Sequence, residues 1–351
     1  MYDRSRIASL EIERDPSDLK VLGKRLSGHA KPWVMRSVFE LVVTLGLLLA
    51  ASTVMLIGVQ AGWPLVLLLA APAGGLLLRL FVIQHDCGHG AFLPTRRAND
   101  LVGACLGVLT FTPYRVWKTS HASHHATSGN LGRRGTGDID TLTVAEYRSL
   151  SRSRRLVYRL YRHPIVMFGI GPAYLFLLRH RLPVGQMKAG WRPWTSAMGT
   201  NAAALALFGA LSLAWGIGTV VLVLLPIVLV AATFGVWLFF VQHQFEETSW
   251  SDEKEWTFHA AAIYGSSFYA LPRLLHWFSG NIGYHHIHHL VSRIPFYRLP
   301  DAMKETEALR GIGRVTLGES FRNVRLALWD EDRRRMISFR AARKLASAGA
   351  V

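Results

Sequence analysis

The stretch from Thr219 to Val241 reads TVVLVLLPIVLVAATFGVWLFFV and contains no charged residue. It is about as long as the roughly 20 apolar residues that a helix needs to cross the hydrocarbon core of a bilayer. Three other runs are nearly free of charge: Ser37–Gln60, Gly62–Ile83 and Ala197–Gly216. Buried helices of a soluble protein explain four such lengths poorly. The sequence therefore predicts an all-α integral membrane protein with four transmembrane helices, at about 37–60, 62–83, 197–216 and 219–241.

The four runs contain two charged residues, Glu40 in the first and Arg79 in the second. Each lies near one end of its run. Long side chains at such positions can reach the polar interface while their stems remain in the apolar region. We therefore expect both charges to reach the membrane surface and the centres of the spans to be uncharged.

The basic residues predict which side of the membrane each segment occupies. The net charge is +17, with 40 Lys and Arg residues. Of these, 8 lie before Ser37, 16 between Gln84 and Ser196, and 15 after Gln242. Since cytoplasmic loops carry an excess of Lys and Arg, both termini and the long middle segment are predicted to be cytoplasmic, with two hairpins crossing the membrane. We expect the bacterial inner membrane, and basic loops facing anionic lipid head groups rather than nucleic acid.

The chain divides into a cytoplasmic N-terminal segment 1–36, a membrane domain 37–310 and a basic cytoplasmic tail 311–351. No cleavable signal peptide is apparent, and the 2 cysteines imply no disulfide framework. Two further apolar stretches, Leu101–Phe111 and Pro164–Leu178, are too short to span a bilayer. We interpret both as interfacial or re-entrant helices belonging to a helical cytoplasmic cap.

Most of the 15 histidines fall in short clusters. The spacing H-x-x-x-H occurs in QHDCGHG, and H-x-x-H-H occurs in both HASHH and HHIHH. Because positions i, i+3 and i+4 share a helical face, each cluster can direct its imidazoles into one volume. One more histidine ends the last predicted span on the same side. The histidines assigned to this shared site are His85, His89, His121, His124, His125, His243, His285, His288 and His289.

Nine imidazoles indicate a metal site with more than one metal. A buried ring nitrogen needs a partner, and a catalytic zinc takes only three protein ligands, so nine nitrogens are naturally shared by two metals. Imidazole suits Fe, Zn and Cu, so the ligand type leaves the metal open. The Glu-x-x-His motif of carboxylate di-iron bundles does not occur in the sequence. The pattern therefore predicts a histidine-rich dinuclear site at the membrane surface.

Other polar residues near the clusters are candidates to orient a metal ligand through a hydrogen bond. They are Asp86, Asp138, Asp140, Glu246, His276, Asn281 and His286. The histidines outside the clusters are expected to be solvated or to cap helices: His29, His163, His180 and His259. Beyond the metal ligands, the sequence assigns no catalytic residue.

The three histidine boxes and the residues around them resemble those of the integral-membrane fatty acid desaturases, over roughly residues 35 to 310. The stretches that carry the resemblance are HDCGHGAF, WKTSHASHHATSGNLGRRGTGDIDTLTVAEY, YRLYRHPIVMFGIGP, FVQHQFEETSW and GNIGYHHIHHLVSRIPFYRLP. The sequence around the boxes is similar to that of the bacterial acyl-lipid branch, which includes delta-12 (omega-6) and omega-3 enzymes. The resemblance implies a di-iron centre held by the eight box histidines, with His243 as the best match for a ninth ligand.

The implied reaction is the oxygen-dependent desaturation of an acyl chain in a membrane lipid, with O2 as co-substrate. An unactivated methylene has no acidic proton, so a metal centre must supply the oxidising power. No dinucleotide-binding fingerprint is visible, and the electrons are expected from an external carrier. An acidic ferredoxin or a cytochrome of the b type would suit the basic cytoplasmic face.

Two alternatives remain open from the residues alone. A di-iron hydroxylase of an alkane, carotenoid or sphingolipid would use the same ligands. A histidine-rich metal transporter would instead place ionisable residues along a pathway inside its spans, and the predicted span centres carry none. The resemblance favours a delta-12 product, although the position of the double bond depends on tunnel depth.

Overall fold

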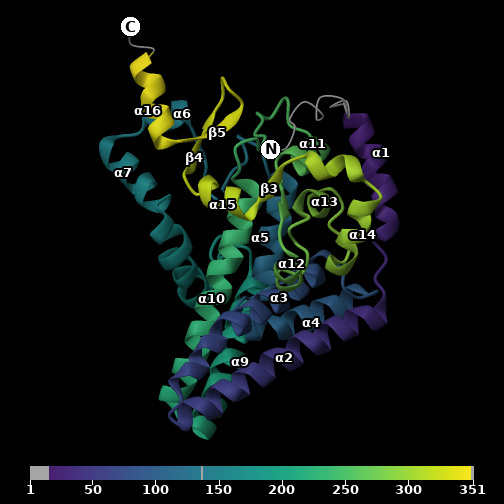
Figure 1. Ribbon diagram of the computed structural model, residues 1–351, viewed down its shortest axis with the longest axis vertical. Coiled ribbons are helices and arrows are strands. Elements are labelled where there is room, and N and C mark those ends of the chain that lie inside the picture. Colours follow the sequence, from purple (N-terminus) through teal and green to yellow (C-terminus); the bar gives the residue numbers. More distant parts are fainter. Residues whose placement is uncertain (1–15, 136, 349–351) are drawn as a thin grey trace.

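The computed structural model describes residues 16–135 and 137–348. Figure 1 shows long helices in the lower part of the molecule and shorter helices and strands forming a cap above them. Four helical segments of the described chain are long and apolar enough to cross a membrane. They are Val34–Gln60, Pro64–His89, Trp191–Trp215 and Ile217–His243. The four predicted spans and the all-α membrane fold are confirmed.

The spans form two hairpins that meet chiefly between α3 (Ala70–His89) and α10 (Ile217–His243). The first hairpin joins α2 (Val34–Gln60) to α3 through a short turn and a 3₁₀ helix, Pro64–Leu69. The second joins α9 (Trp191–Trp215) to α10 through Gly216, whose φ of +78° is a conformation that glycine adopts without strain. α3 packs most extensively against α10. Both of these helices continue past their predicted ends into the cap.

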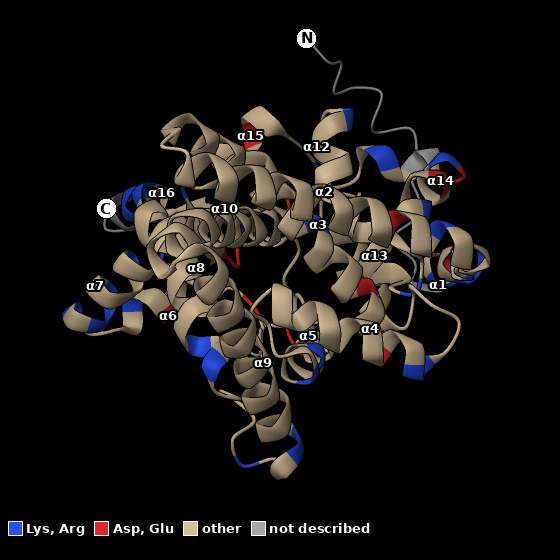
Figure 2. Cartoon of the chain, turned by 90° about the horizontal axis from the view of Figure 1, so that it is seen from below, with Lys and Arg blue, Asp and Glu red and all other residues tan. Residues whose placement is uncertain are grey.

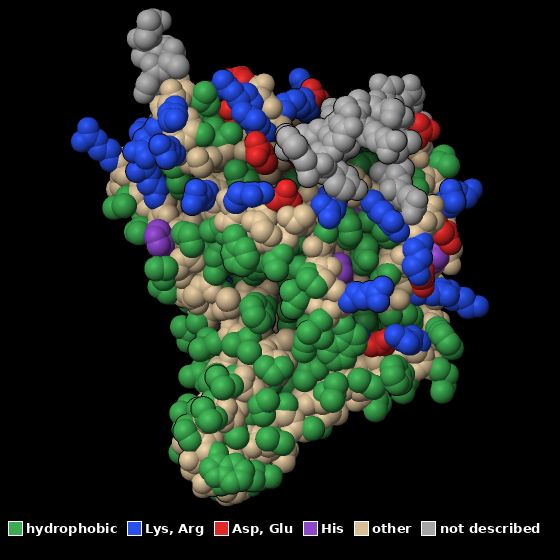
Figure 3. All heavy atoms as spheres, viewed as in Figure 1, with side chains coloured by type: hydrophobic (Ala, Val, Ile, Leu, Met, Phe, Trp, Pro, Cys, Tyr) green, Lys and Arg blue, Asp and Glu red, His purple; other side chains and the backbone are tan. Residues whose placement is uncertain are grey.

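The lower part of the molecule is covered by apolar side chains. Figure 3 shows hydrophobic residues over the lower half of one face, whereas Lys and Arg gather in the upper half. Near the turn between α9 and α10, Leu213 is 93% exposed. Soluble monomers rarely expose a contiguous apolar surface of this extent. This part of the surface is therefore suited to contact lipid rather than water.

The expectation that Glu40 and Arg79 would reach the membrane surface is wrong. Glu40 is 3% exposed and Arg79 is 2% exposed, and the two side chains form an ion pair between α2 and α3. Arg79 Nε also donates to Thr44 Oγ1 at 3.2 Å. The prediction failed because the two helices bring these residues face to face, so each charge finds a partner inside the protein.

The insert between the hairpins begins with α4 (Arg96–Leu109) and α5 (Tyr114–Thr127), followed by α6 (Val144–Ser149) and α7 (Arg152–Tyr161). α4 exposes Leu101 and buries Gly103 and Leu106, as a helix does when one face meets lipid and the other meets protein. The predicted second interfacial stretch is also helical. It consists of α8 (Gly171–Ala173) with a π-helical turn on each side, Val166–Ile170 and Tyr174–Leu178.

The cap contains short helices and five short strands of the described chain. The helices are α1 (Pro16–Leu26), α11 (Phe258–Tyr264), α12 (Arg273–Phe278), α13 (His285–Leu290), α14 (Leu299–Lys304), α15 (Leu317–Asn323) and α16 (Phe339–Ala348). The strands are β1 (Leu142–Thr143), β2 (Phe268–Ala270), β3 (Arg314–Thr316), β4 (Leu326–Asp330) and β5 (Arg335–Ser338). The sequence did not predict these strands, which are too short for a clear alternating pattern.

Strand pairing ties the end of the chain to the rest of the cap. β3 pairs in parallel with β2, and β4 pairs in parallel with β1 and antiparallel with β5. The described part of the predicted tail 311–351 is therefore folded against segments that precede it. The first 15 residues of the predicted segment 1–36 lie outside the described residues.

Candidate metal centre

Four helices bring the nine predicted histidines together where the spans enter the cap. α3 and α10 contribute from the membrane side, and α5 and α13 contribute from the cap. The imidazoles form two groups, and within each group one nitrogen from every ring lies within 4.8 Å of the others. The first group is His85, His89, His121, His125 and His288, and the second is His124, His243, His285 and His289.

Each H-x-x-H-H box divides between the two groups. On α5, His121 and His125 belong to the first group and His124 to the second. On α13 the division is reversed, since His285 and His289 belong to the second group and His288 to the first. Residues i and i+4 therefore act together, while the residue between them turns toward the other group. The expectation that each box would fill a single volume was too simple.

Ring nitrogens of different histidines approach one another closely within both groups. In the first group, His121 Nε2 lies 3.0 Å from His89 Nε2 and 3.1 Å from His125 Nε2. In the second group, His243 Nε2 lies 3.2 Å from His124 Nε2 and 3.0 Å from His285 Nε2. A ring nitrogen has one lone pair or one hydrogen in the ring plane, so it cannot satisfy two such neighbours fully.

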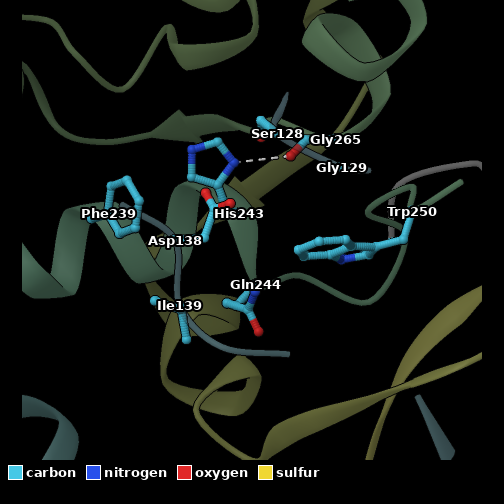
Figure 4. A pocket seen from close by; sticks show the side chains of 9 residues that line it. All are labelled: Ser128, Gly129, Asp138, Ile139, Phe239, His243, Gln244, Trp250 and Gly265. Carbon is cyan, nitrogen blue, oxygen red and sulfur yellow. Dashed lines mark hydrogen bonds between the residues drawn. The ribbon is translucent and has the colours of Figure 1, made fainter. Parts of the chain in front are cut away.

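Nearby acceptors fix which nitrogen of three of these rings carries the hydrogen. His124 Nδ1 is hydrogen-bonded to the Asp138 carboxylate, and His243 Nδ1 donates to the carbonyl of Gly265 at 3.1 Å (Figure 4). His85 Nδ1 lies 3.3 Å from Asp86 Oδ1. With hydrogen on Nδ1, the Nε2 atoms present lone pairs to the site. For His124 and His243, these lone pairs face each other.

Burial keeps five imidazoles of the cap neutral. Desolvation, followed by the neighbouring imidazoles, holds the pKa of His285, His288 and His289 well below its ordinary value. The same causes lower the pKa of His121 and His125. Neutral imidazole is the form that binds a metal, so the site needs little proton release before it is loaded.

This donor set fits metal ions. Two neutral rings with facing lone pairs repel each other unless a cation lies between them, and the second group is entirely buried. The second group offers four imidazoles and the first group five, which is enough nitrogen ligands for one metal in each group. Aromatic packing also holds the rings in place, because Trp117 stacks on His121 at 4.7 Å and Phe239 lies against both His124 and His243.

Two of the candidate orienting carboxylates lie away from the histidines. Glu246 is at the surface, where its carboxylate lies 3.4 Å from Arg335. Asp140 contributes its backbone rather than its carboxylate, since its carbonyl accepts from Tyr158 and Arg162 and its N–H donates to Tyr161. Both positions lie in loops between elements, where sequence proximity says little about side-chain direction. Asp86 and Asp138 are the carboxylates that contact ligand candidates.

The remaining candidates surround the third histidine box without entering either group. His276 Nε2 accepts the Leu271 N–H at 3.3 Å. Asn281 has a φ of +53°, and its side chain donates to the Phe296 carbonyl at 3.3 Å. His286 is fully buried on the other side of α13, where burial lowers its pKa to about 4. These residues shape the loop that presents α13 to the site.

Sequence reasoning missed two features. The Gly265 carbonyl orients His243, but a backbone acceptor has no signature in residue type. His180 was expected to be solvated or capping, whereas its Nδ1 is buried without a hydrogen-bond partner among the described residues. Burial lowers its pKa to about 4. A clue was available, since His180 lies only two residues after the end of the apolar stretch 164–178.

A cavity of about 640 Å³ leads from the membrane helices to the histidines. Its walls come from α3, α5 and α10 and from the segment 166–184. Figure 2 shows the helices α3, α5, α8 and α10 in the view from below. The cavity touches His85 and His121 of the first group and His285 of the second. Gln242 and Val228 both line it, and 14 residues of α-helix separate them by about 21 Å. An apolar chain can thus approach both groups.

The fold and site define a class of protein: a four-span membrane protein with two groups of closely spaced imidazoles, one of them entirely buried, at the end of a long apolar cavity. Comparison of the sequence with known proteins agrees with this class. Residues 61–316 match the sequence model of the family described as "Fatty acid desaturase". The chain belongs to the fatty acid desaturase family, and it is therefore an oxidoreductase.

Relatives with assigned names support the family over most of the chain. A "Fatty acid desaturase" of Bacillus subtilis (strain 168) is 41% identical over 326 residues, covering 93% of this chain and 92% of the relative. An "sn-1 acyl-lipid omega-3 desaturase (ferredoxin)" of Nostoc sp. (strain 36) is 28% identical, covering 73% and 69%. An "Acyl-lipid omega-3 desaturase (cytochrome b5), endoplasmic reticulum" of Arabidopsis thaliana is 30% identical, covering 71% and 64%.

Proposed function

We propose that this protein is a di-iron acyl-lipid desaturase that introduces a cis double bond into a chain esterified to a membrane lipid. We propose further that the first histidine group holds one iron and the second group the other. The observation that carries the proposal is the cavity, because one apolar space touches members of both groups. The delta-12 position predicted from the sequence is retained as the expected regiospecificity.

The overall reaction needs an oxidant, electrons and protons in balance. The substrate segment –CH2–CH2– loses two hydrogens and becomes –CH=CH–. Together with two electrons and two protons from outside, these reduce O2 to two molecules of water. When bound, the irons would supply the O2-dependent oxidising chemistry that removes hydrogen from the unactivated methylenes.

The protein's own residues orient the metal ligands, position the substrate and exclude water from the site. Asp138 and the Gly265 carbonyl keep hydrogen on Nδ1 of His124 and His243, so that Nε2 stays available as a ligand. The apolar walls of the cavity position the substrate methylenes beside His85 and His121. Because the second histidine group is entirely buried, bulk water is kept away from the reacting chain.

An external carrier is proposed as the source of electrons. The Nostoc and Arabidopsis relatives are named for ferredoxin and cytochrome b5 respectively, and a soluble acidic carrier of either type would be attracted to the basic cap. We propose that both termini and the site face the cytoplasm of a bacterial cell, with the protein in the inner membrane. The excess of Lys and Arg outside the spans supports this orientation.

Expression in a host that contains oleate but no linoleate tests the function. Lipids are extracted intact, and mass spectrometry locates new double bonds. Linoleate in intact phospholipid is the expected product, and an omega-3 or other position would change only the regiospecificity. Hydroxylated lipid or carotenoid without a new alkene would contradict the proposal. The variant His124→Ala serves as the inactive control, since it removes one ligand of the second group.

A further inference from the structure

The large cavity has one closed end and one exposed end. Between α3 and α10 its lining is buried: Leu77, Leu78, Val228 and Ala232. Apart from two glycines of the cap, the exposed residues that line it all belong to the segment 170–184. They are Ile170, Tyr174, Arg179, Leu182 and Val184. An acyl chain would therefore place its methyl end between the spans and leave its ester at the segment 170–184.

The wall at the exposed end is built from π-helical turns. A π-helix is rare and occurs mostly as single turns at functional sites, and here two such turns flank Gly171 and Pro172. Pro172 has no N–H to donate to the Phe168 carbonyl four residues earlier. Thr233 on α10 donates its hydroxyl to that carbonyl instead, at 3.0 Å. The widened helix is thus fastened to α10 at a defined point along the cavity wall.

The exposed end also lies close to the start of a membrane span. Arg181, two residues after Arg179, donates from Nη1 to Asn201 Oδ1 on α9 at 2.8 Å. Arg179 and Arg181 belong to a basic run that also includes Lys188 and ends at Arg192 in the first turn of α9. Basic residues just outside a span occupy the head-group region of the bilayer. The exposed end, which is the mouth of the cavity, therefore lies in the region of the bilayer where lipid phosphates are found.

Arg179 is the cation at this mouth that has no assigned structural role. No carboxylate of the described residues pairs with Arg179, whereas Arg181 is held by Asn201 and by backbone carbonyls. Asp138 is the one carboxylate among the described residues that line the cavity, and it is committed to His124. His180 beside Arg179 is neutral at pH 7, since its pKa is lowered to about 4, chiefly by burial.

We propose that Arg179 binds the phosphate group of the substrate and so fixes how far the acyl chain enters the cavity. This inference rests on the proposed function and adds the substrate class: an acyl chain whose carrier bears a phosphate. A guanidinium presents paired N–H donors that match phosphate oxygens. A phospholipid head group and the phosphates of a soluble acyl thioester share this chemistry. The position of the exposed end of the cavity in the head-group region favours the phospholipid.

Steady-state kinetics of Arg179→Gln test the proposal with three substrates that have the same acyl chain. They are phosphatidylglycerol in vesicles, an uncharged galactosyl diacylglycerol in vesicles, and acyl-coenzyme A. For phosphatidylglycerol we expect KM to rise about tenfold with kcat unchanged, which corresponds to about 1.4 kcal/mol. The galactolipid should show no change. Arg179→Lys should restore much of the loss, and Arg192→Gln, another exposed arginine of the same basic run, should behave as the wild type.

A binding measurement on the purified protein separates substrate binding from turnover. Native mass spectrometry should show retained phosphatidylglycerol with wild-type protein and Arg179→Lys, and less with Arg179→Gln. A dependence on Arg179 that appears with acyl-coenzyme A alone supports the phosphate site and assigns it to a soluble thioester. Equal changes for phospholipid and galactolipid, or no change with any of the three substrates, would overturn the inference. If wild-type protein forms no alkene from any substrate, the proposed function itself fails.

Discussion

Glu40 and Arg79 face each other between the first two spans and form an ion pair that both helices bury. Arg79 also donates to the carbonyl of Trp277 and lies over the rings of Trp277 and Phe296, at 4.5 and 5.0 Å. These two aromatic residues flank the loop that carries the third histidine box. The pair thus connects α2 and α3 to the part of the cap that presents α13.

Breaking this pair should destabilise the protein strongly. Replacing one partner leaves a buried charge with incomplete compensation, and we expect Glu40→Leu or Arg79→Met to lower the free energy of unfolding by about 3–5 kcal/mol. The double replacement should lose less than either single one. Denaturant titration in detergent measures these values. Arg36→Gln removes a 2.6 Å ion pair to Glu40 from a side chain that is 47% exposed, so it should change stability by at most about 1 kcal/mol. Single replacements no more harmful than this control would contradict the prediction.

The division of each histidine box between two groups predicts the metal content of neighbouring variants. Wild-type protein should contain about two irons per chain. His288→Ala weakens the first group and His289→Ala the second, so each should retain about one iron and lose turnover. His286→Ala in the same box should keep both, because His286 belongs to neither group. Elemental analysis of folded, purified protein provides the measurement. Stoichiometric zinc with negligible iron in active protein would contradict the assignment.

Asp138 should matter although it belongs to neither histidine group. It hydrogen-bonds His124 Nδ1, and loss of such an orienting carboxylate typically lowers metal affinity or activity by about 10–100-fold. We expect Asp138→Asn to reduce iron retention during dialysis against a chelator by this amount. Glu246→Gln is the matched control, since Glu246 is paired with Arg335 at the surface. Equal iron loss in both variants would contradict an orienting role for Asp138.

The sequence predicted the features that depend on local pattern. The spans were predictable because a helix that crosses the bilayer needs a long, predominantly apolar run. The histidine boxes were predictable because i, i+3 and i+4 spacing defines a helical face. The extension of α3 to His89 and of α10 to His243 also agrees with the sequence. Each of these inferences uses the sequence of a single helix and needs no knowledge of how helices pack together.

Features that depend on how two elements face each other were not predictable. The ion pair of Glu40 and Arg79 requires the relative rotation of α2 and α3. The assignment of His124 to a different group from His121 requires the orientation of α5 against α10 and α13. The Gly265 acceptor requires a loop conformation, and backbone carbonyls are identical in every residue. Sequence proximity likewise suggested Asp140 and Glu246 as orienting groups, yet Asp140 is exposed and Glu246 pairs with Arg335.

The predicted orientation in the membrane can be tested by accessibility labelling. Tags after Met1 and Val351, and a cysteine introduced at Gly135, should be labelled only from the cytoplasmic side. Cysteines introduced at the hairpin turns, Gly62 and Gly216, should be labelled from the opposite side, because charge-poor turns are translocated while basic segments remain inside. Labelling at Gly135 from outside intact cells would reverse the orientation. The site would then be separated from any cytoplasmic electron carrier.

The closed end of the cavity should determine which chain lengths the enzyme accepts. Val228 lines this end and is 7% exposed, and it lies about 21 Å along α10 from the level of Gln242. Val228→Phe would fill the space expected to hold the methyl end of a long chain. Each buried methylene contributes about 0.8 kcal/mol, so excluding two methylenes should weaken binding of the longest accepted chain by about 1.6 kcal/mol, or roughly 15-fold.

The matched control for this variant is Leu225→Phe on the same helix, because Leu225 is exposed and does not line the cavity. Competition between chains of two lengths, offered in the same vesicles and analysed by mass spectrometry, measures the preference directly. We expect Val228→Phe to favour the shorter chain and Leu225→Phe to match the wild type. If Val228→Phe lowers the turnover of both chain lengths equally, Val228 lies on the entry route instead, and the methyl end of the substrate must occupy another part of the cavity.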